Sequence, residues 1–276
     1  MLAKLFFSLF FVPWTLGTSF GGSFIVEPGI ETTASAYIVQ NSSNHTTVLQ
    51  KNAQTPFPMA SLSKLMSAMV FLDSNPEWEK IMEILGEDDR IGGKLYIFPG
   101  EKLTVKDLFY GALVGSANNA TMALVRVLGI SEEEFIKRMN EKAQFLGMKN
   151  TIFYDPTGLN PKNAGSAEDI ILLLNVAMTY KPIKDALQTR TYEFSTLNTR
   201  EQHRIKNTDE LLGSFLNEAP YKFIGGKTGY LDEAGYCLAA KVQKGTQEFS
   251  VVVLHSKSSS SRFLEAKALL YWALSH

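Results

Sequence analysis

A serine and a lysine that could act together stand three positions apart in Ser61-Leu62-Ser63-Lys64. On a helix, residues at this spacing lie on one face, one turn apart. A serine hydroxyl becomes an effective nucleophile when a neighbouring base removes its proton, and a neutral lysine amine can be that base. Burial or nearby positive charge must first lower the pKa of the lysine. The pair therefore indicates acyl transfer through a serine ester, although an N-cap serine followed by a solvated lysine has the same pattern.

A second pair of polar side chains, Ser116 and Asn118, lies on the predicted link between two helices. The hydroxyl could relay a proton, and the amide could hold an acceptor on a substrate backbone. Both residue types also favour helix N-termini, so they could simply cap the helix that follows. The same spacing recurs in Ser42-Ser43-Asn44, so this pair alone identifies no site.

A third motif, Lys227-Thr228-Gly229, follows two glycines and leads into a predicted strand. It combines a cation, a hydroxyl and a glycine that lets a substrate approach the backbone closely. An exposed strand edge of this kind can bind an extended peptide by strand addition, and the lysine would attract a carboxylate. A surface turn is the alternative interpretation of the same three residues.

The elements predicted around these motifs are strands at both ends of the chain and helices between them. Residues 36–40 and 46–50 flank a polar turn and predict a hairpin, and apolar residues at spacings of three and four predict a helix that begins at Ser61. Ser131 before three glutamates is typical of a helix N-cap. We therefore expect an α+β fold, with one sheet completed by both ends of the chain and a helical lobe inserted. Further helices are predicted at residues 104–113, 119–128 and 263–274, and further strands at residues 236–242 and 249–254.

The composition excludes several classes of function. The chain has 276 residues, of which 45% are hydrophobic and 20% charged, as expected of one catalytic domain or one domain of two lobes. Its net charge is -1 with the basic residues scattered, so no nucleic-acid surface is expected. The single cysteine, Cys237, can form no internal disulfide. The four histidines are far apart and fit no metal-binding spacing, so we expect neither a metal nor a cofactor.

The first 17 residues have the three-part plan of a secretory signal peptide. A lysine is followed by a short apolar run, residues 5–12, and then by small residues at a plausible cleavage site. The run is too short to span a bilayer comfortably, although an uncleaved anchor or a buried helix remains an alternative. We therefore expect a protein exported to the cell envelope, with no membrane contact except through this leader, and a catalytic domain at residues 24–276.

The three motifs together, in this order, match the set found in penicillin-binding proteins and class A β-lactamases. Ala117 stands where that set has aspartate. The chain resembles the D-alanyl-D-alanine carboxypeptidase branch of the penicillin-binding proteins, the S11 serine peptidases. The resemblance implies a DD-peptidase/β-lactamase-like α+β fold with an antiparallel sheet. It rests on the motifs and on four longer stretches, residues 58–68, 99–105, 155–159 and 227–238.

The resemblance also implies catalytic roles. Ser61 is expected to attack the carbonyl of a D-Ala-D-Ala peptide bond and form an acyl-enzyme. Lys64 is expected to accept the serine proton, and Ser116 to help pass it to the leaving amine. The implied substrate is a peptidoglycan stem peptide that ends in D-Ala-D-Ala, and β-lactams are the implied covalent inhibitors.

A further group of residues is implied to bind the substrate. Asn118 would orient its acyl side, and Lys227 and Thr228 would hold its terminal carboxylate. The backbone N–H groups of the nucleophile and of Tyr230 would form the oxyanion hole, where one donor typically contributes about 3 kcal/mol. Arg262 would lie near the substrate carboxylate, although an exposed arginine at a helix start is the plain alternative.

Three competing functions are weighed against this interpretation. A class A β-lactamase needs a glutamate three residues before Leu159-Asn160, and Pro156 stands there instead. A cell-wall-binding protein without activity would have no need of the complete acylation motifs. A D,D-endopeptidase that cuts cross-links remains open, because the chain stops after residues 271–274, where the catalytic domain is expected to end. We therefore expect no C-terminal β domain, as in the shorter members of the family.

Overall fold

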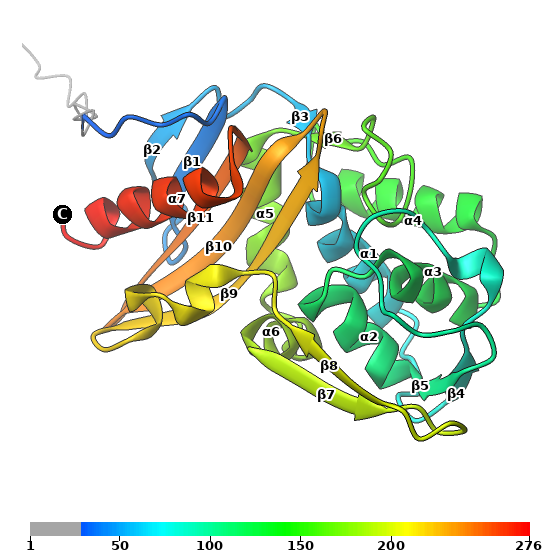
Figure 1. Ribbon diagram of the computed structural model, residues 1–276. Helices are drawn as coiled ribbons and strands as arrows, with labels where there is room; N and C mark the ends of the chain where they lie inside the picture. The colour runs from blue at the N-terminus through cyan, green and yellow to red at the C-terminus, as the bar shows by residue number, and fades with distance from the viewer. Residues whose placement is uncertain (1–28) are drawn as a thin grey trace, which may run out of the picture.

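A five-stranded antiparallel sheet forms one half of the molecule (Figure 1). The computed structural model describes residues 29–276, so the predicted leader at residues 1–17 lies outside the described residues. The strand order is β2-β1-β11-β10-β9, which joins the predicted N-terminal hairpin to the three strands near the C-terminus. Ile38 of β1 lies opposite Val252 of β11, and Gly229 of β9 lies opposite Cys237 of β10. The predicted sheet built from both ends of the chain is confirmed. Its strands are β1 (Ala36–Asn41), β2 (Thr47–Lys51), β9 (Tyr221–Leu231), β10 (Gly235–Lys244) and β11 (Gln247–Ser256).

Both faces of this sheet are covered, so alternate residues of each strand enter different cores. Val39 and Val251 belong to the core under α7 (Ser259–Ala273). Ile38 and Val252 belong to the larger core, which includes α5 (Ala167–Ala177) and the helical lobe. Because β1, β10 and β11 are covered on both faces, their sequences contain consecutive hydrophobic residues rather than alternating hydrophobic and polar ones.

The helical lobe lies between β2 and β9 in the chain and beside the sheet in space (Figure 1). Local capping explains where two of its helices begin: the Thr104 and Ser131 side chains accept hydrogen bonds from the N–H groups of Asp107 and Glu134. The predicted helix start at Ser61 is corrected, because Ser61 lies in a short 3₁₀ turn that precedes α1. The lobe contains η1 (Ala60–Leu62), α1 (Ser63–Leu72), α2 (Val105–Val114), α3 (Asn118–Val127), α4 (Glu132–Phe145) and α6 (Lys181–Gln188).

A two-stranded hairpin, β7 (Thr191–Ser195) with β8 (Gln202–Lys206), lies along the lower side of the lobe in Figure 1. It packs on α2 through Tyr192, whose ring stacks on Tyr110 at 4.3 Å and whose hydroxyl donates to Asp107 Oδ1 at 2.7 Å. The hairpin is thus fixed to the lobe. The remaining short elements are β3 (Phe57–Pro58), β4 (Ile81–Glu83), η2 (Gly86–Asp88), β5 (Lys102–Thr104), β6 (Ala164–Gly165), η3 (Glu210–Gly213) and η4 (Phe215–Asn217).

Two structural features are absent from residues 29–276. None of the helices there combines the length and apolar character that crossing a membrane requires. Within the same residues, no three His, Cys, Asp or Glu side chains gather as a metal-binding group.

Candidate active site

Ser61 and Lys64 meet at the junction of the sheet and the helical lobe. Lys64 Nζ donates a hydrogen bond to Ser61 Oγ at 2.9 Å. The 3₁₀ turn leaves Ser61 partly exposed, while the first turn of α1 buries Lys64 to 1% exposure. The nucleophile candidate is therefore open to a ligand, and its potential base is not.

Two fixed acceptors hold the Lys64 amine in place. Its Nζ donates to Asn118 Oδ1 at 2.6 Å and to the Thr157 carbonyl at 2.6 Å. Burial lowers the pKa of Lys64 to about 7, against the opposing charge of Asp155. A neutral amine at this position would keep its two N–H donors on Asn118 and Thr157, which directs its lone pair at Ser61 Oγ. Burial and geometry together make Lys64 a candidate general base.

The backbone around Ser61 is strained and closely packed. Ala60 has a φ of 47°, which is uncommon for a residue with a side chain. A Cβ built on Gly158 would lie 2.0 Å from the Ala60 carbonyl oxygen, and one built on Gly229 would lie 3.1 Å from Ser61 N. Only glycines allow the neighbouring loop and β9 to pack this closely against the turn that contains Ser61.

Ser116 lies on the predicted link between α2 and α3, whereas Asn118 is the first residue of α3; Ser116 contacts Lys227 and Asn118 contacts Lys64. Ser116 has a φ of 55°, a second strained conformation beside the site. The Asn118 amide group bridges two segments: its Oδ1 accepts from Lys64, and its Nδ2 donates to the Ile91 carbonyl at 2.7 Å. Ser42-Ser43-Asn44, which has the same spacing, lies in the β1–β2 turn instead.

Lys227 is the second buried lysine of the site. It lies within β9 at 1% exposure, so the alternative of a surface turn is wrong. Its Nζ donates to Ser116 Oγ at 2.8 Å and to the Thr228 carbonyl at 2.9 Å. Burial, and then the positive charges of Lys64 and Arg262, hold the pKa of Lys227 well below its usual value. Two hydroxyl–lysine pairs, Ser61 with Lys64 and Ser116 with Lys227, thus share one electrostatic environment.

The rest of β9 presents further polar groups. Thr228 is buried, and its hydroxyl lies 2.7 Å from the hydroxyl of Thr208. Tyr230 is 48% exposed at the end of the motif, with its ring stacked on Tyr236 at 4.3 Å. Because β9 is the outermost strand of the sheet, one of its edges has no strand partner among the described residues, and Gly229 of this strand lies close to Ser61.

Arg262 lies behind β9, and it is buried rather than exposed at the surface. Its Nη1 donates to the Gly229 carbonyl at 3.0 Å and to the Cys237 carbonyl at 3.4 Å. Its guanidinium lies 5.5 Å from the ring centre of Tyr236, and its Nε has no partner within residues 29–276. The structure therefore places Arg262 beside the motif, with much of its donor capacity used on the strands.

The sequence patterns missed the loop that completes the lysine site. Asp155 Oδ1 accepts from Thr157 N, from Thr157 Oγ1 and from Gly158 N, and Asp155 Oδ2 accepts from Asn160 N. These bonds fix the Thr157 carbonyl on Lys64. Residues 155–159 are one of the stretches that resemble the family, but a backbone acceptor has no side-chain signature of its own.

Asp209 is the other residue that the patterns missed. It is 2% exposed, its Oδ1 accepts from Leu211 N at 2.9 Å, and its Oδ2 has no partner within the described residues. A Cβ on Gly226 would lie 2.3 Å from this oxygen, so β9 needs glycine there. Burial raises the pKa of Asp209 to about 7, against the charges of Arg262 and Lys227. Asp209 belongs to no recognisable motif in the sequence, so its burial against β9 could not be predicted.

The arrangement as a whole suits acyl transfer. It offers a partly exposed hydroxyl with a buried amine as base, a second hydroxyl–amine pair for proton transfer, and a free strand edge beside both. Such a combination is typical of serine acyl-transferases.

Comparisons with known proteins agree with this class. The sequence profile of the family described as D-alanyl-D-alanine carboxypeptidase, peptidase S11, matches residues 24–258. The chain therefore belongs to the S11 peptidase family. It is 31% identical to D-alanyl-D-alanine carboxypeptidase DacF of Bacillus subtilis over 82% of this chain, and it spans 58% of the length of that relative. It is 34% identical to a D-alanyl-D-alanine endopeptidase of Haemophilus influenzae, over 83% of this chain and 77% of the relative.

Solved structures give the same answer for the fold. The Streptomyces K15 DD-transpeptidase superposes with a TM-score of 0.83 at 26% identity, over 90% of this chain and 99% of the other. The predicted DD-peptidase-like fold and family membership are confirmed by these matches.

Proposed function

We propose that this chain is a serine-type D-Ala-D-Ala carboxypeptidase that acts on peptidoglycan stem peptides through an ester on Ser61. The observation that carries the proposal is the Lys64 amine, which is buried and held by two fixed acceptors while it faces Ser61 Oγ at 2.9 Å. A solvated lysine next to a helix cap would show neither the burial nor the acceptors.

Acylation starts when Ser61 Oγ attacks the substrate carbonyl and its proton moves to Lys64. The resulting ammonium needs three acceptors, and Asn118 Oδ1, Thr157 O and the serine oxygen lie at 2.6, 2.6 and 2.9 Å. The site can therefore hold both protonation states of the lysine without moving it, which keeps reorganisation small.

The leaving amine needs a proton when its bond to carbon breaks. We assign this proton to Ser116, because its hydroxyl accepts a hydrogen bond from Lys227 Nζ at 2.8 Å and keeps its own O–H to donate. Ser116 gives its own proton to the amine and takes one from Lys227, while Lys64 keeps the proton from Ser61, so the total charge is unchanged over the step. Water then hydrolyses the Ser61 ester and releases the acyl group.

Substrate binding is assigned to β9. An extended peptide adds to the free edge of this strand, and the N–H groups of Ser61 and Tyr230 receive the developing oxyanion. Thr228 and Lys227 bind the terminal carboxylate. Arg262, which donates a hydrogen bond to the Gly229 carbonyl, adds positive charge nearby. Asn118 contacts the acyl side of the substrate with hydrogen-bonding groups of its amide that are not used by Lys64 and the Ile91 carbonyl.

The proposal includes two consequences for the cell and for inhibitors. Export by the leader at residues 1–17 would bring the site to the cell envelope, where peptidoglycan lies. β-Lactams would acylate Ser61, and the resulting ester would hydrolyse slowly. The reason is that Pro156 stands where a class A β-lactamase carries its deacylating glutamate.

Release of D-alanine from a soluble peptide that ends in D-Ala-D-Ala tests the proposal. Wild type should release it, and Ser61→Ala should lose at least about 10³-fold in kcat/KM. Ser43→Ala, an exposed serine in the β1–β2 turn, is the matched control and should keep full activity. Rapid and sustained nitrocefin hydrolysis by wild type, without release of D-alanine, would show a β-lactamase instead.

A further inference from the structure

An exposed isoleucine lies at the edge of the candidate active site. The Ile91 side chain is 81% exposed, and the Ile91 carbonyl accepts a hydrogen bond from Asn118 Nδ2 at 2.7 Å. A Cβ lies about 3 Å from the carbonyl oxygen of its own residue, so Ile91 Cβ is within about 6 Å of the Asn118 amide nitrogen. Single exposed apolar residues are common on protein surfaces, so what distinguishes Ile91 is its place beside Asn118.

The two residues after Ile91 are glycines, and their backbone lies directly against the site. Gly92 has a φ of 82°, and a Cβ built on it would lie 3.2 Å from Asn118 Nδ2. A Cβ on Gly93 would lie 3.1 Å from the Ser116 carbonyl oxygen, and the Gly93 carbonyl accepts from Asn118 N at 2.7 Å. Ile91 is therefore the last side chain of this loop before the chain reaches Asn118 and Ser116.

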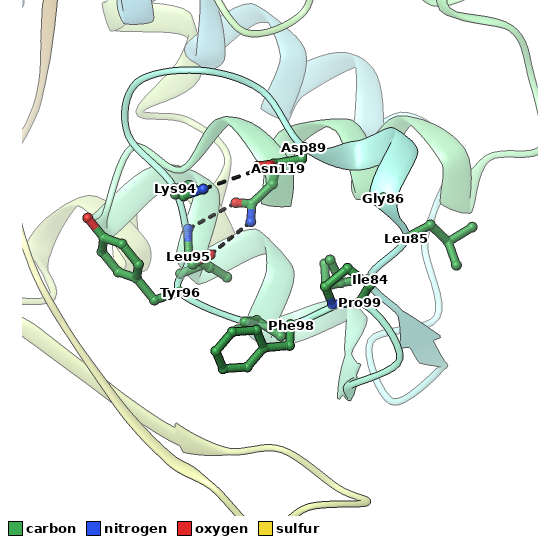
Figure 2. Close-up of a pocket in the computed structure, with 11 residues that line it drawn as sticks. Ile84, Leu85, Gly86, Asp89, Lys94, Leu95, Tyr96, Phe98, Pro99 and Asn119 are labelled. Carbon is green, nitrogen blue, oxygen red and sulfur yellow. Dashed lines mark hydrogen bonds and ion pairs between the residues drawn. The ribbon is translucent and has the colours of Figure 1, made fainter.

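The loop that carries Ile91 is held in place by contacts on both sides of it. The Asn119 side chain bonds to the backbone N–H and carbonyl of Leu95, at 2.9 Å each (Figure 2). An exposed ion pair between Lys94 and Asp89, at 3.7 Å, adds a weaker contact across the base of the loop (Figure 2). Because the loop is fixed before a ligand arrives, a ligand that covers Ile91 loses little entropy in ordering it.

A second aliphatic side chain lies close to the same loop. Leu159 is half-buried, and its Cδ2 lies 3.8 Å from the position that a Cβ on Gly92 would take. It belongs to the loop that also places the Thr157 carbonyl in the site. Ile91 and Leu159 thus come from two different loops and lie on the side of the site where Asn118 is assigned to the acyl part of the substrate. We name these two residues the acyl-side rim.

We propose that Ile91 is a specificity-determining residue, which makes the enzyme prefer substrates with a long apolar side chain on the residue before D-Ala-D-Ala. This inference rests on the proposed acyl transfer at Ser61 and adds a preference on the acyl side. The residue before the two D-alanines belongs to the acyl part of the substrate, which is the part assigned to Asn118. A long aliphatic side chain there can lie on Ile91, so that apolar surface of both leaves water, whereas glycine at the same position has no side chain to cover it.

Two acetylated peptides test this inference with the full chain. Diacetyl-L-lysyl-D-Ala-D-Ala has a long, uncharged side chain before the D-alanines, and acetylglycyl-D-Ala-D-Ala has none. The variants are Ile91→Ser, which removes the apolar surface, and Ile91→Leu, which keeps it. Ile81→Ser on β4 is the matched control, because Ile81 is also an exposed isoleucine, at 57%, and lies outside the candidate site.

Ile91→Ser should lose about fivefold in kcat/KM for release of D-alanine from the lysyl peptide and change less than about twofold on the glycyl peptide. Ile91→Leu and Ile81→Ser should stay within about twofold of wild type on both peptides. Equal losses of Ile91→Ser on the two peptides, no loss on the lysyl peptide, or the same loss in Ile81→Ser would each overturn the inference. A wild type that releases no D-alanine from either peptide and is not labelled by penicillin would instead contradict the proposed acyl transfer itself.

Discussion

Asn118 Oδ1 lies 2.6 Å from Lys64 Nζ, closer than Ser61 Oγ at 2.9 Å. The neutral amide accepts a hydrogen bond from the amine without adding a charge that would keep the amine protonated. Asn118 therefore positions the Lys64 amine, and burial lowers the pKa of that amine.

The first prediction concerns the pH dependence of acylation. Because burial lowers the pKa of Lys64 to about 7, the amine is neutral above that pH and carries no lone pair below it. The rate constant for labelling by a fluorescent penicillin should rise about tenfold per pH unit below pH 6 and level off above pH 8. A profile that is flat between pH 5 and pH 8 would exclude Lys64 as the base.

Asn118→Asp should move that profile. A carboxylate at the position of the amide would place a negative charge against Lys64 and favour the ammonium, so the pKa of Lys64 should rise by about one unit or more. The midpoint of the labelling profile should shift to higher pH by the same amount. Asn119→Asp, at the next position of α3, is the control for charge alone, because Asn119 bonds to Leu95 rather than to Lys64.

Gly229→Ala tests the close approach of β9 to the nucleophile. The added Cβ would lie 2.9 Å from the Met59 carbonyl oxygen and 3.1 Å from Ser61 N, so the strand must shift away from the oxyanion position. Acylation should slow by about 10²-fold. Gly86→Ala meets nothing within 4 Å and should leave the rate unchanged. Equal rates for Gly229→Ala and wild type would show that β9 does not help to form the oxyanion hole.

Asp209→Asn should change how stability depends on pH. Burial raises the pKa of Asp209 from 3.8 to about 7, so between these values the unfolded chain releases a proton that the folded chain retains. The free energy of unfolding of wild type should therefore fall, relative to the variant, as pH rises from about 4 to about 7, by up to about 4 kcal/mol. Urea unfolding at several pH values measures the difference, and parallel curves for the two proteins would contradict it.

Local signals in the sequence accounted for much of the fold. The turn at residues 41–45, the N-cap at Ser131 and the apolar runs of β10 and β11 are determined by neighbouring residues, and each was predicted. The β7–β8 hairpin was not predicted, because its aromatic residues are stabilised by α2, some 80 residues earlier in the chain. Interactions of that range leave no periodic pattern in the sequence.

The candidate site likewise has residues that the sequence predicted and one group that it could not predict. Ser61, Lys64, Ser116 and Lys227 stood in recognisable motifs, and the structure brings them together in two hydrogen-bonded pairs. The Thr157 carbonyl could not be predicted, since any residue supplies a carbonyl and only the fold selects one. The catalytic roles of Ser61, Lys64, Ser116 and Lys227 stay predictions.

Mass spectrometry of the penicillin adduct tests the central claim most directly. After brief incubation with benzylpenicillin, the intact protein should gain the mass of one penicilloyl group, and peptide mapping should place it on Ser61. Ser61→Ala should gain none under the same conditions, while Ser63→Ala in the same motif should still react if it folds. An adduct on another residue, or an equal adduct on Ser61→Ala, would contradict Ser61 as the nucleophile.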